Sequence, residues 1–149
     1  MKTSPEGIAA IRSFEGRVLR AYQDTGGVWT IGVGHTGPEV VKGLVWTKEQ
    51  ADAMLGKDLV RFELAVEAAV KVRLAQGQFD ALVSLAFNIG AGAFAGSTLV
   101  KKLNAGDTAG AGAQFISWHK DNGVVNNVLL ARRAAELWTF ASSSPKASA

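Results

Sequence analysis

The sequence has 149 residues, of which 48% are hydrophobic and 19% charged, with no cysteine and a net charge of +3. These values are typical of a compact globular chain and exclude an intrinsically disordered one. The lack of cysteine excludes disulfides, a catalytic thiol and thiolate metal ligands. No run approaches 18 consecutive apolar residues, so we expect no membrane-spanning helix. The charge is a slight bias toward anionic partners, too small to choose among them.

The first expected helix begins at a Ser-Pro-Glu sequence, residues 4–6, which supplies a capping hydroxyl, a proline at the first helical position and an acid in the first turn. Apolar residues then recur at three-residue steps up to Phe14. Gly16 is expected to end this helix, which places Glu15 at or near its C-terminal end. The partial negative charge of that end favours a protonated carboxyl group, the form that a general acid needs.

Two short strands are expected over residues 18–22 and 28–33, joined by a glycine-rich turn at residues 24–27. A third, weaker strand is expected near residues 39–45. Thr47 and Gln50 form a capping-box pattern, and the apolar periodicity after it predicts a long helix over about residues 48–70. Gly56 lies inside that helix, where a bend or break could occur.

The rest of the chain is predicted to be helical, with its most apolar and most buried helix over residues 76–88. Short helices follow at about 92–95 and at 98–104, the second capped by Ser97. Another is expected over 107–118, capped by Asp107, followed by a polar loop at 120–127. The last helix, about 129–140, is expected to bury the residues Leu130, Ala134, Leu137 and Trp138.

These elements predict an α+β fold, mostly α, in a single domain over residues 1–141. A small β-hairpin lobe, about 15–46, would be joined by a long helix, about 47–70, to a larger helical lobe formed by residues 1–14 and 70–141. A cleft is expected between the two lobes. The small polar tail, residues 142–149, is expected to be flexible.

Two carboxyl groups, those of Glu15 and Asp24, would then face this cleft from different elements. Such a pair can hydrolyse a glycosidic bond: one protonated group donates to the leaving oxygen, and one ionised group activates water or attacks the sugar. Glu15 is the better acid because it lies at a helix end, and Thr30 could hydrogen-bond a water held by Asp24. Spacing alone does not select this chemistry, because an aspartate beside glycines is common in turns.

Glu15, Asp24 and Thr30 form an E-x8-D-x5-T pattern, which is followed by I-G-V-G-H at residues 31–35. This pattern resembles the active-site block of the phage-type lysozymes, or endolysins, of glycoside hydrolase family 24, and the segment from residue 20 to 35 reads R-A-Y-Q-D-T-G-G-V-W-T-I-G-V-G-H. That block usually reads R/K-x-Y-x-D-x-x-G-x-x-T-I-G-x-G-H. Residues 87–90, F-N-I-G, followed by S-T-L at 97–99, and residues 132–136, R-R-A-A-E, resemble two further family blocks. The family's frequent N-P-G-L is here N-N-V-L, at residues 126–129, so the loop before the last helix is expected to differ.

The resemblance implies a lysozyme-like fold with Glu15 as general acid, and Asp24 with Thr30 positioning the attacking water. It implies inversion at the anomeric carbon, which requires carboxyl groups about 6.5–9.5 Å apart. The implied substrate is the β-1,4 bond between N-acetylmuramic acid and N-acetylglucosamine in peptidoglycan, without a metal or cofactor. The alternatives are a lytic transglycosylase, for which Asp24 and Thr30 would be dispensable, and a non-catalytic peptidoglycan-binding domain.

Further candidates for binding the glycan are Trp29, His35, Asn88, Arg132 and Arg133. We expect Trp29 to be exposed, because Ile31 and Val33 on the same strand face can supply the core. His35 is more readily explained as a structural residue that fixes the β unit against the body. The remaining tryptophans, at positions 46, 118 and 138, are expected in the core or at the junction of the lobes.

Asn88 either caps the C-terminal end of its helix or binds a sugar N-acetyl group; the sequence does not choose. The adjacent Arg132 and Arg133 could be a solvated basic pair, but we favour one of them near the cleft, where it could reach Glu15. No metal-binding motif includes the two histidines, so a zinc site is not expected.

No basic stripe with interleaved aromatic residues is present, so nucleic acid is not an expected partner. The N-terminal residues show no apolar stretch before a cleavage site, which predicts the absence of a signal peptide. We therefore expect a monomer that accumulates in the host cytoplasm. It would reach the cell wall, in the periplasm, after a separate membrane lesion such as a phage holin releases it.

Overall fold

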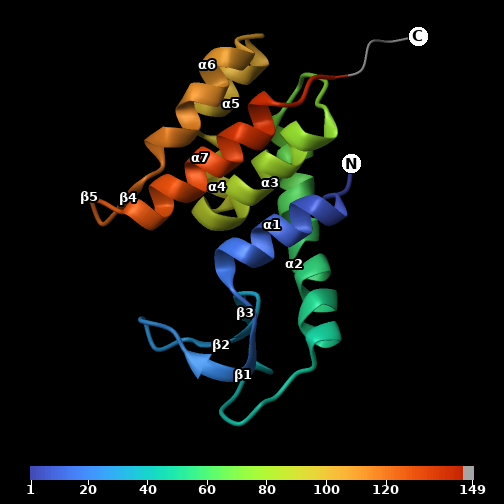
Figure 1. Ribbon diagram of the computed structural model, residues 1–149, viewed down its shortest axis with the longest axis vertical. Helices are drawn as coiled ribbons and strands as arrows, with labels where there is room; N and C mark the ends of the chain where they lie inside the picture. Colours follow the sequence, from blue (N-terminus) through green and yellow to red (C-terminus); the bar gives the residue numbers. More distant parts are fainter. Residues whose placement is uncertain (146–149) are drawn as a thin grey trace. The chain divides into compact units, whose positions relative to one another are not determined.

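The computed structural model describes residues 1–145, and the fold is α+β and mostly α, as predicted (Figure 1). Part of the expected flexible tail, residues 146–149, lies outside the described residues. The chain divides into two compact units: a sheet unit of residues 8–60, and a helical unit of residues 1–7 with those from 61 onward. Within residues 1–145 no helix combines the length and the apolar character that crossing a bilayer requires.

Helix α1 (Pro5–Glu15) begins and ends where the sequence predicts. The Ser4 hydroxyl accepts a hydrogen bond from the Gly7 amide at 3.1 Å, as a capping residue does. Gly16 follows the helix with a φ of +78°, and its amide donates to the Arg12 carbonyl at 2.9 Å. Glu15 is therefore the last helical residue, and its side chain leaves the helix at the negative end of the dipole.

Strands β1 (Val18–Gln23) and β2 (Trp29–Gly32) pair antiparallel with Tyr22 opposite Thr30, and β2 pairs with β3 (His35–Thr36). The two predicted strands are confirmed, but the third is wrong. Residues 39–45 contribute only an isolated bridge between Val45 and Arg20. The chain turns immediately after β2, at Gly34, which has a φ of +69°. The segment that follows at once, β3, therefore pairs with the free edge of β2 in place of residues 39–45.

The sheet covers a small apolar core on one face. Its buried members are Ala21, Ile31 and Val40, against which Trp29, Leu44 and Trp46 pack partly buried. Side chains alternate between the faces of a strand, and directly opposite residues share a face. Thr30 and Tyr22 therefore lie on the face opposite Ile31, away from this core.

Helix α2 (Lys48–Ala69) has the predicted extent. The Thr47 hydroxyl accepts from the Gln50 amide at 3.1 Å, and the Gln50 side chain accepts from the Thr47 amide at 2.8 Å, which is the reciprocal capping box. The helix continues without a break through Gly56.

Helix α3 (Gln76–Ile89) is the centre of the helical unit. All nine side chains from Gln78 to Ala86 are buried, which means that neighbours surround the helix on every side. Phe79, Leu82 and Leu85 have no exposed surface at all. This confirms the expectation drawn from its density of apolar residues. Helices α4 (Ala91–Ala95) and α5 (Thr98–Asn104) follow, and Ser97 caps α5 as predicted.

Two later segments differ from their predictions. The helix expected over 107–118 is α6 (Thr108–Ala113) followed by a 3-10 turn, η1 (Gln114–Ser117), although Asp107 does cap it. The expected polar loop contains a small hairpin of β4 (Lys120–Asp121) and β5 (Val124–Val125). Its turn is Asn122-Gly123, both with positive φ, which is the Asn-Gly pair that two-residue hairpins favour.

Helix α7 (Asn127–Ala141) begins two residues before its predicted start and ends one residue after its predicted end. It is also rotated about its axis relative to the prediction. Its buried residues are Arg132, Arg133, Glu136 and Phe140. The expected inner face is wrong: Ala134 is exposed, and Trp138 is 75% exposed. The helix turns its charged residues inward because they find partners there.

Those partners come in part from α3, which lies beside α7 (Figure 1). Arg133 Nε lies 2.5 Å from Glu136 Oε1, and Arg132 Nε lies 3.3 Å from Glu136 Oε2. From α3, the Ser84 hydroxyl donates to Glu136 Oε2 at 2.5 Å, and the Ser84 carbonyl accepts from Arg132 Nη2 at 3.1 Å. A buried carboxylate shared by two buried guanidinium groups thus holds the two helices together.

We predict that Glu136→Gln destabilises the protein by about 3 kcal/mol, because it leaves two buried guanidinium groups with a neutral partner. Urea unfolding measures this free energy. The control is Glu49→Gln at an exposed position in the first turn of α2, which should cost less than about 0.5 kcal/mol. Equal effects of the two substitutions would show that the buried cluster contributes nothing special to stability.

Candidate active site

Glu15 presents its carboxyl group to the turn between β2 and β3. A Cβ atom added to Gly34 would lie 3.8 Å from Glu15 Oε2, so the acid and this turn are close neighbours. Gly34 has a φ of +69°, which disfavours any other residue there. The side chain of Glu15 is exposed. The last residue of α1 thus meets the β unit through its carboxylate, as its position at the helix end predicts.

An ion-pair cluster that the sequence did not reveal fixes this end of α1. Arg17 Nη1 donates to both carboxylate oxygens of Asp52, at 2.9 and 3.0 Å. Arg12 Nη1 lies 3.5 Å from Asp52 Oδ2. Asp52 is on α2, so one carboxylate binds the two arginines that flank Glu15 in sequence. No motif marks Asp52, because its role depends on where α2 lies beside α1.

Asp24 is oriented by the backbone of its own turn. Its Oδ1 accepts from the amides of Gly26 at 2.8 Å and Val28 at 2.9 Å. The amide of Asp24 also donates to the Val28 carbonyl at 2.9 Å. Within residues 1–145 no donor is bound to Oδ2, and the residue is exposed. One carboxylate oxygen is therefore held in place while the other faces solvent.

Thr30 is 5% exposed, and its hydroxyl donates to the same Val28 carbonyl at 3.0 Å. The hydroxyl proton is thus directed to the backbone, and the lone pairs of the oxygen point elsewhere. Asp24 and Thr30 both bind the backbone of Val28. Asp24 binds the Val28 amide and carbonyl, and Thr30 binds the Val28 carbonyl. Glu15, Asp24 and Thr30 accordingly come from three successive elements of one compact unit.

His35 is held between two carboxylates of the same unit. Its Nδ1 lies 2.7 Å from Asp58 Oδ2 on α2, and its Nε2 lies 2.6 Å from Glu39 Oε1. The ring centroid is 5.5 Å from that of Trp46. Partial burial opposes the charged ring, but the hydrogen bonds and charges of the two carboxylates outweigh it and raise the pKa of His35 above 6.5. Both ring nitrogens are engaged by carboxylates of the protein, which fits a structural role for His35 in the β unit. A contact of His35 with the substrate stays a prediction.

The expectation that Trp29 is exposed is wrong. The side chain is partly buried and packs against the small core of Ala21, Ile31 and Val40. Three small or medium side chains cannot fill the space under the sheet, so Trp29 completes it. Any contact of Trp29 with a glycan would use only the part of the ring that stays exposed.

In the helical unit, Arg132 and Arg133 are 6% and 0% exposed, which excludes a solvated basic pair. Arg133 Nη1 donates to Asn88 Oδ1 at 3.0 Å, so the buried cluster extends to the end of α3. The cap residue of α3 is Gly90, whose amide donates to the Ala86 carbonyl. Asn88 is therefore a partner of Arg133. The expectation that one arginine reaches Glu15 stays a prediction.

Asn88 also lines a polar hollow of about 440 Å³ in the helical unit. Its wall includes Trp118 and Lys120, next to the β4–β5 hairpin. Asn88 is exposed, and within residues 1–145 its Nδ2 has no acceptor, because only Oδ1 is engaged by Arg133. The side-chain amide is thus held by one atom and can donate with the other.

Comparison with known proteins gives one consistent family. The family described as Phage lysozyme matches residues 12–136. The endolysin of Bacillus phage PZA is 47% identical over 98% of this chain, which spans only 57% of that protein. The endolysin of Salmonella phage P22 is 42% identical, covering 95% of this chain and 99% of that protein. The muramidase domain of SpmX from Asticaccaulis excentricus superposes with a TM-score of 0.88 at 40% identity, covering 93% of this chain and 97% of that one.

We predict that protonated His35 stabilises the fold. A raised folded-state pKa means that this stabilisation is fully present below about pH 6.5 and is lost as pH rises through the folded value. Urea unfolding from pH 5.5 to 8.5 should show a fall of about 1 kcal/mol in the parent that His35→Gln lacks. Asp58→Asn should flatten the same profile in part. Parallel profiles for the parent and His35→Gln would contradict this role.

Proposed function

This chain belongs to the phage lysozyme family, and we propose that it is an endolysin, a muramidase that hydrolyses bacterial peptidoglycan. The bond cleaved is the β-1,4 bond between N-acetylmuramic acid and N-acetylglucosamine. The observation that carries the proposal is that Glu15, Asp24 and Thr30 lie in one unit. The backbone of Val28 orients Asp24 and Thr30, and Glu15 lies beside the turn between β2 and β3. Glycoside hydrolysis requires two carboxyl groups in different roles. Here one lies at a helix end, and the other lies in a turn whose amides hold one of its oxygens.

In this proposal Glu15 donates its proton to the glycosidic oxygen as the bond to the anomeric carbon breaks. Its carboxyl group lies at the C-terminal end of α1, beside the turn between β2 and β3. Positive charge develops on the sugar ring, and a water attacks the anomeric carbon from the opposite face. Asp24 takes the proton of that water, so the product has the inverted configuration.

The hydrogen bonds of Asp24 and Thr30 support a single site for this water. Asp24 Oδ1 is held by two amides, which directs Oδ2 to solvent. The Thr30 proton is donated to Val28, which leaves the hydroxyl oxygen as an acceptor. A water that donates one hydrogen to each of these oxygens turns its own lone pairs away from them, toward the sugar.

The helical unit would contribute recognition of the glycan. Both sugars carry an N-acetyl group, whose carbonyl is an acceptor. The Nδ2 group of Asn88 is a donor fixed by Arg133 at the edge of the polar hollow. This supports the N-acetyl group as its ligand. Arg133 then acts on the substrate only through Asn88, which it positions.

The enzyme must also reach its substrate, and another protein would provide that route. Peptidoglycan is outside the membrane, and we propose cytoplasmic accumulation followed by release through a phage holin. The chain would act as a monomer, because a single copy holds all three catalytic candidates in one unit.

We predict that Glu15→Gln lowers the rate of peptidoglycan hydrolysis by at least about 100-fold, since glutamine cannot donate the proton. Clearing of a cell suspension and zymography on purified peptidoglycan measure the loss. Unfolding midpoints should stay near that of the parent, because the side chain is exposed. The control, Glu49→Gln, should retain full activity. An active Glu15→Gln protein would remove Glu15 from the reaction.

A second prediction concerns Thr30. Thr30→Ser keeps the hydroxyl and should retain most of the activity, whereas Thr30→Val should lose about 10-fold or more while costing about 1 kcal/mol of stability. Mass spectrometry of the products identifies the reaction. Reducing ends with the α configuration, read by NMR before mutarotation, support inversion. Products with 1,6-anhydro ends, formed equally by Thr30→Val, would mean that the enzyme is a lytic transglycosylase.

A further inference from the structure

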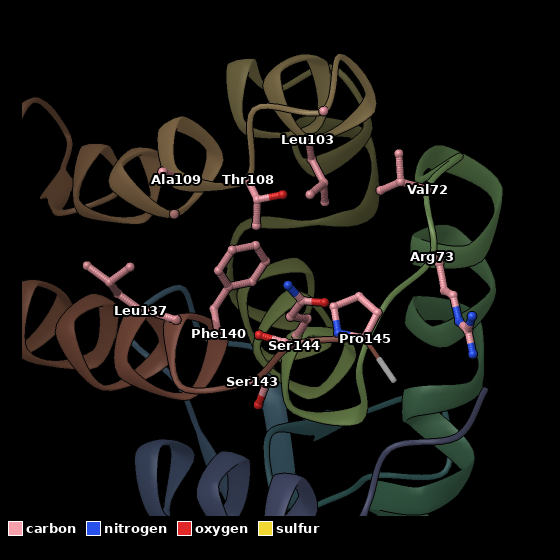
Figure 2. Close-up of a pocket in the computed structure, with 14 residues that line it drawn as sticks. Val72, Arg73, Leu103, Thr108, Ala109, Leu137, Phe140, Ser143, Ser144 and Pro145 are labelled. Atoms are coloured by element: carbon pink, nitrogen blue, oxygen red, sulfur yellow. The ribbon is translucent and has the colours of Figure 1, made fainter. Parts of the chain in front are cut away.

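Helix α7 leaves one side uncovered, and that side carries no charge. Its two arginines and its glutamate are buried against α3. On another side of the helix, Figure 2 shows Phe140 pointing toward Thr108, the first residue of α6. The residues that α7 leaves exposed are Asn127, Val128, Ala131, Ala134, Ala135, Trp138, Thr139 and Ala141.

Two large apolar side chains dominate this uncovered side. Val128 is 76% exposed and Trp138 is 75% exposed. The outer side of a helix on a protein surface usually carries charged and polar residues, because water solvates them there. In α7 the charged residues face inward, and the exposed residues between the valine and the tryptophan are all alanines. An exposed apolar strip of this kind is typical of an interaction surface.

Four residues on this side have the spacing of a paired helix. Val128, Ala131, Ala135 and Trp138 follow one another at steps of three, four and three residues. The residues that form the seam between two packed helices recur at these steps. We call these four residues the α7 seam. Its two central alanines allow the backbone of another helix to approach closely.

The α7 seam is complementary to itself. In either direction along the helix it reads large, small, small, large. A second copy of α7 that runs antiparallel would therefore place Trp138 against Val128 of the other copy, and Ala131 against Ala135 of the other copy. The two ends of such a pairing are identical, as an interface between copies related by a two-fold axis requires.

A lipid surface suits this side of α7 less well. Helices that lie on membranes combine an apolar face with exposed lysines and arginines, which meet anionic headgroups. Both arginines of α7 are instead buried and paired with Glu136, and the helix has no lysine. The uncharged seam therefore favours a protein surface of the same character, which a second α7 seam supplies.

We propose that two copies of this protein pair through their α7 seams, with the two helices antiparallel. The seam extends over about three turns of helix, whereas stable interfaces use about 20–30 residues of each partner. The pairing is therefore weak and depends on concentration. The protein would pair where it accumulates, and the dilute enzyme would act as a monomer. The three catalytic candidates belong to the other unit, so the pairing does not rest on the proposed hydrolysis.

Sedimentation equilibrium of the full chain measures this pairing. The average mass should rise toward twice that of one chain as the concentration increases to about 1 mM. Trp138→Ala should raise the dissociation constant about tenfold, because it removes the largest side chain from both ends of the seam. The matched control is Leu64→Ala, which truncates an apolar residue that is 60% exposed on α2 of the same unit. It should pair as the parent does, and both variants should keep the unfolding midpoint of the parent.

Disulfide cross-linking tests the antiparallel direction, since the chain has no cysteine of its own. In the proposed pair, Val128→Cys in one copy places a thiol beside that of Trp138→Cys in another, and the opposite end keeps its contact of Trp138 with Val128. Two copies of the same variant would hold their thiols about 15 Å apart along the helix axes, too far for a disulfide. An equal mixture should therefore cross-link on mild oxidation, and neither variant alone should do so.

The proposal is overturned if the mass stays that of one chain at about 1 mM, or if Trp138→Ala pairs as well as Leu64→Ala. It is also overturned if either cysteine variant cross-links by itself as readily as the mixture does. Vesicles of phosphatidylglycerol test the lipid alternative. Cosedimentation of the parent with them, lost in Trp138→Ala and without any rise in mass of the free protein, would assign this side of α7 to a membrane instead.

Discussion

The helical unit depends on the carboxylate of Glu136, which is shared by two buried guanidinium groups. Removing an arginine and a glutamate from water is costly, and the cost is met only when every hydrogen-bonding atom finds a partner. Ser84 on α3 donates to Glu136 and accepts from Arg132, and Asn88 accepts from Arg133. The cluster therefore sets the rotation of α7 about its axis and its register against α3. It also orients Asn88, the candidate glycan contact, so packing and the proposed recognition would depend on the same ions.

In the sheet unit the comparable constraint is the backbone of Val28. Its amide holds the Asp24 carboxylate, and its carbonyl accepts from both the Asp24 amide and the Thr30 hydroxyl. The two side chains that we propose to share one water are thus anchored on the backbone of one residue. Glu15 is placed independently, by the end of α1 and by Asp52, which binds the flanking arginines. The proposed acid and the proposed water-positioning pair therefore come from separate elements of the same unit.

Short-range features were read correctly from the sequence because their causes are local. Ser4, Thr47, Ser97 and Asp107 each satisfy amides within their own first turn. Gly16 and the turn at residues 24–27 follow from backbone sterics. The family blocks identified Glu15, Asp24 and Thr30 as candidates. One error arose at the third strand, where β3 rather than residues 39–45 pairs with β2. Another arose in the helix expected over 107–118, because η1 replaces its second half although its composition allows an α-helix to continue.

The sequence by itself determined the fold class, the capped starts of several helices and the three residues to which we assign the chemistry, because these follow from local hydrogen bonding and from short sequence motifs. Only the tertiary structure decided which face of α7 is buried. The apolar residues of a helix are expected to face the core, because burying a charge without a partner is costly. In α7 the charged residues face the core instead, because Glu136 and Ser84 supply partners for the buried arginines. It likewise decided that Trp29 fills the core under the sheet and that His35 lies between Asp58 and Glu39. These contacts join residues from separate elements, and no local pattern contains them.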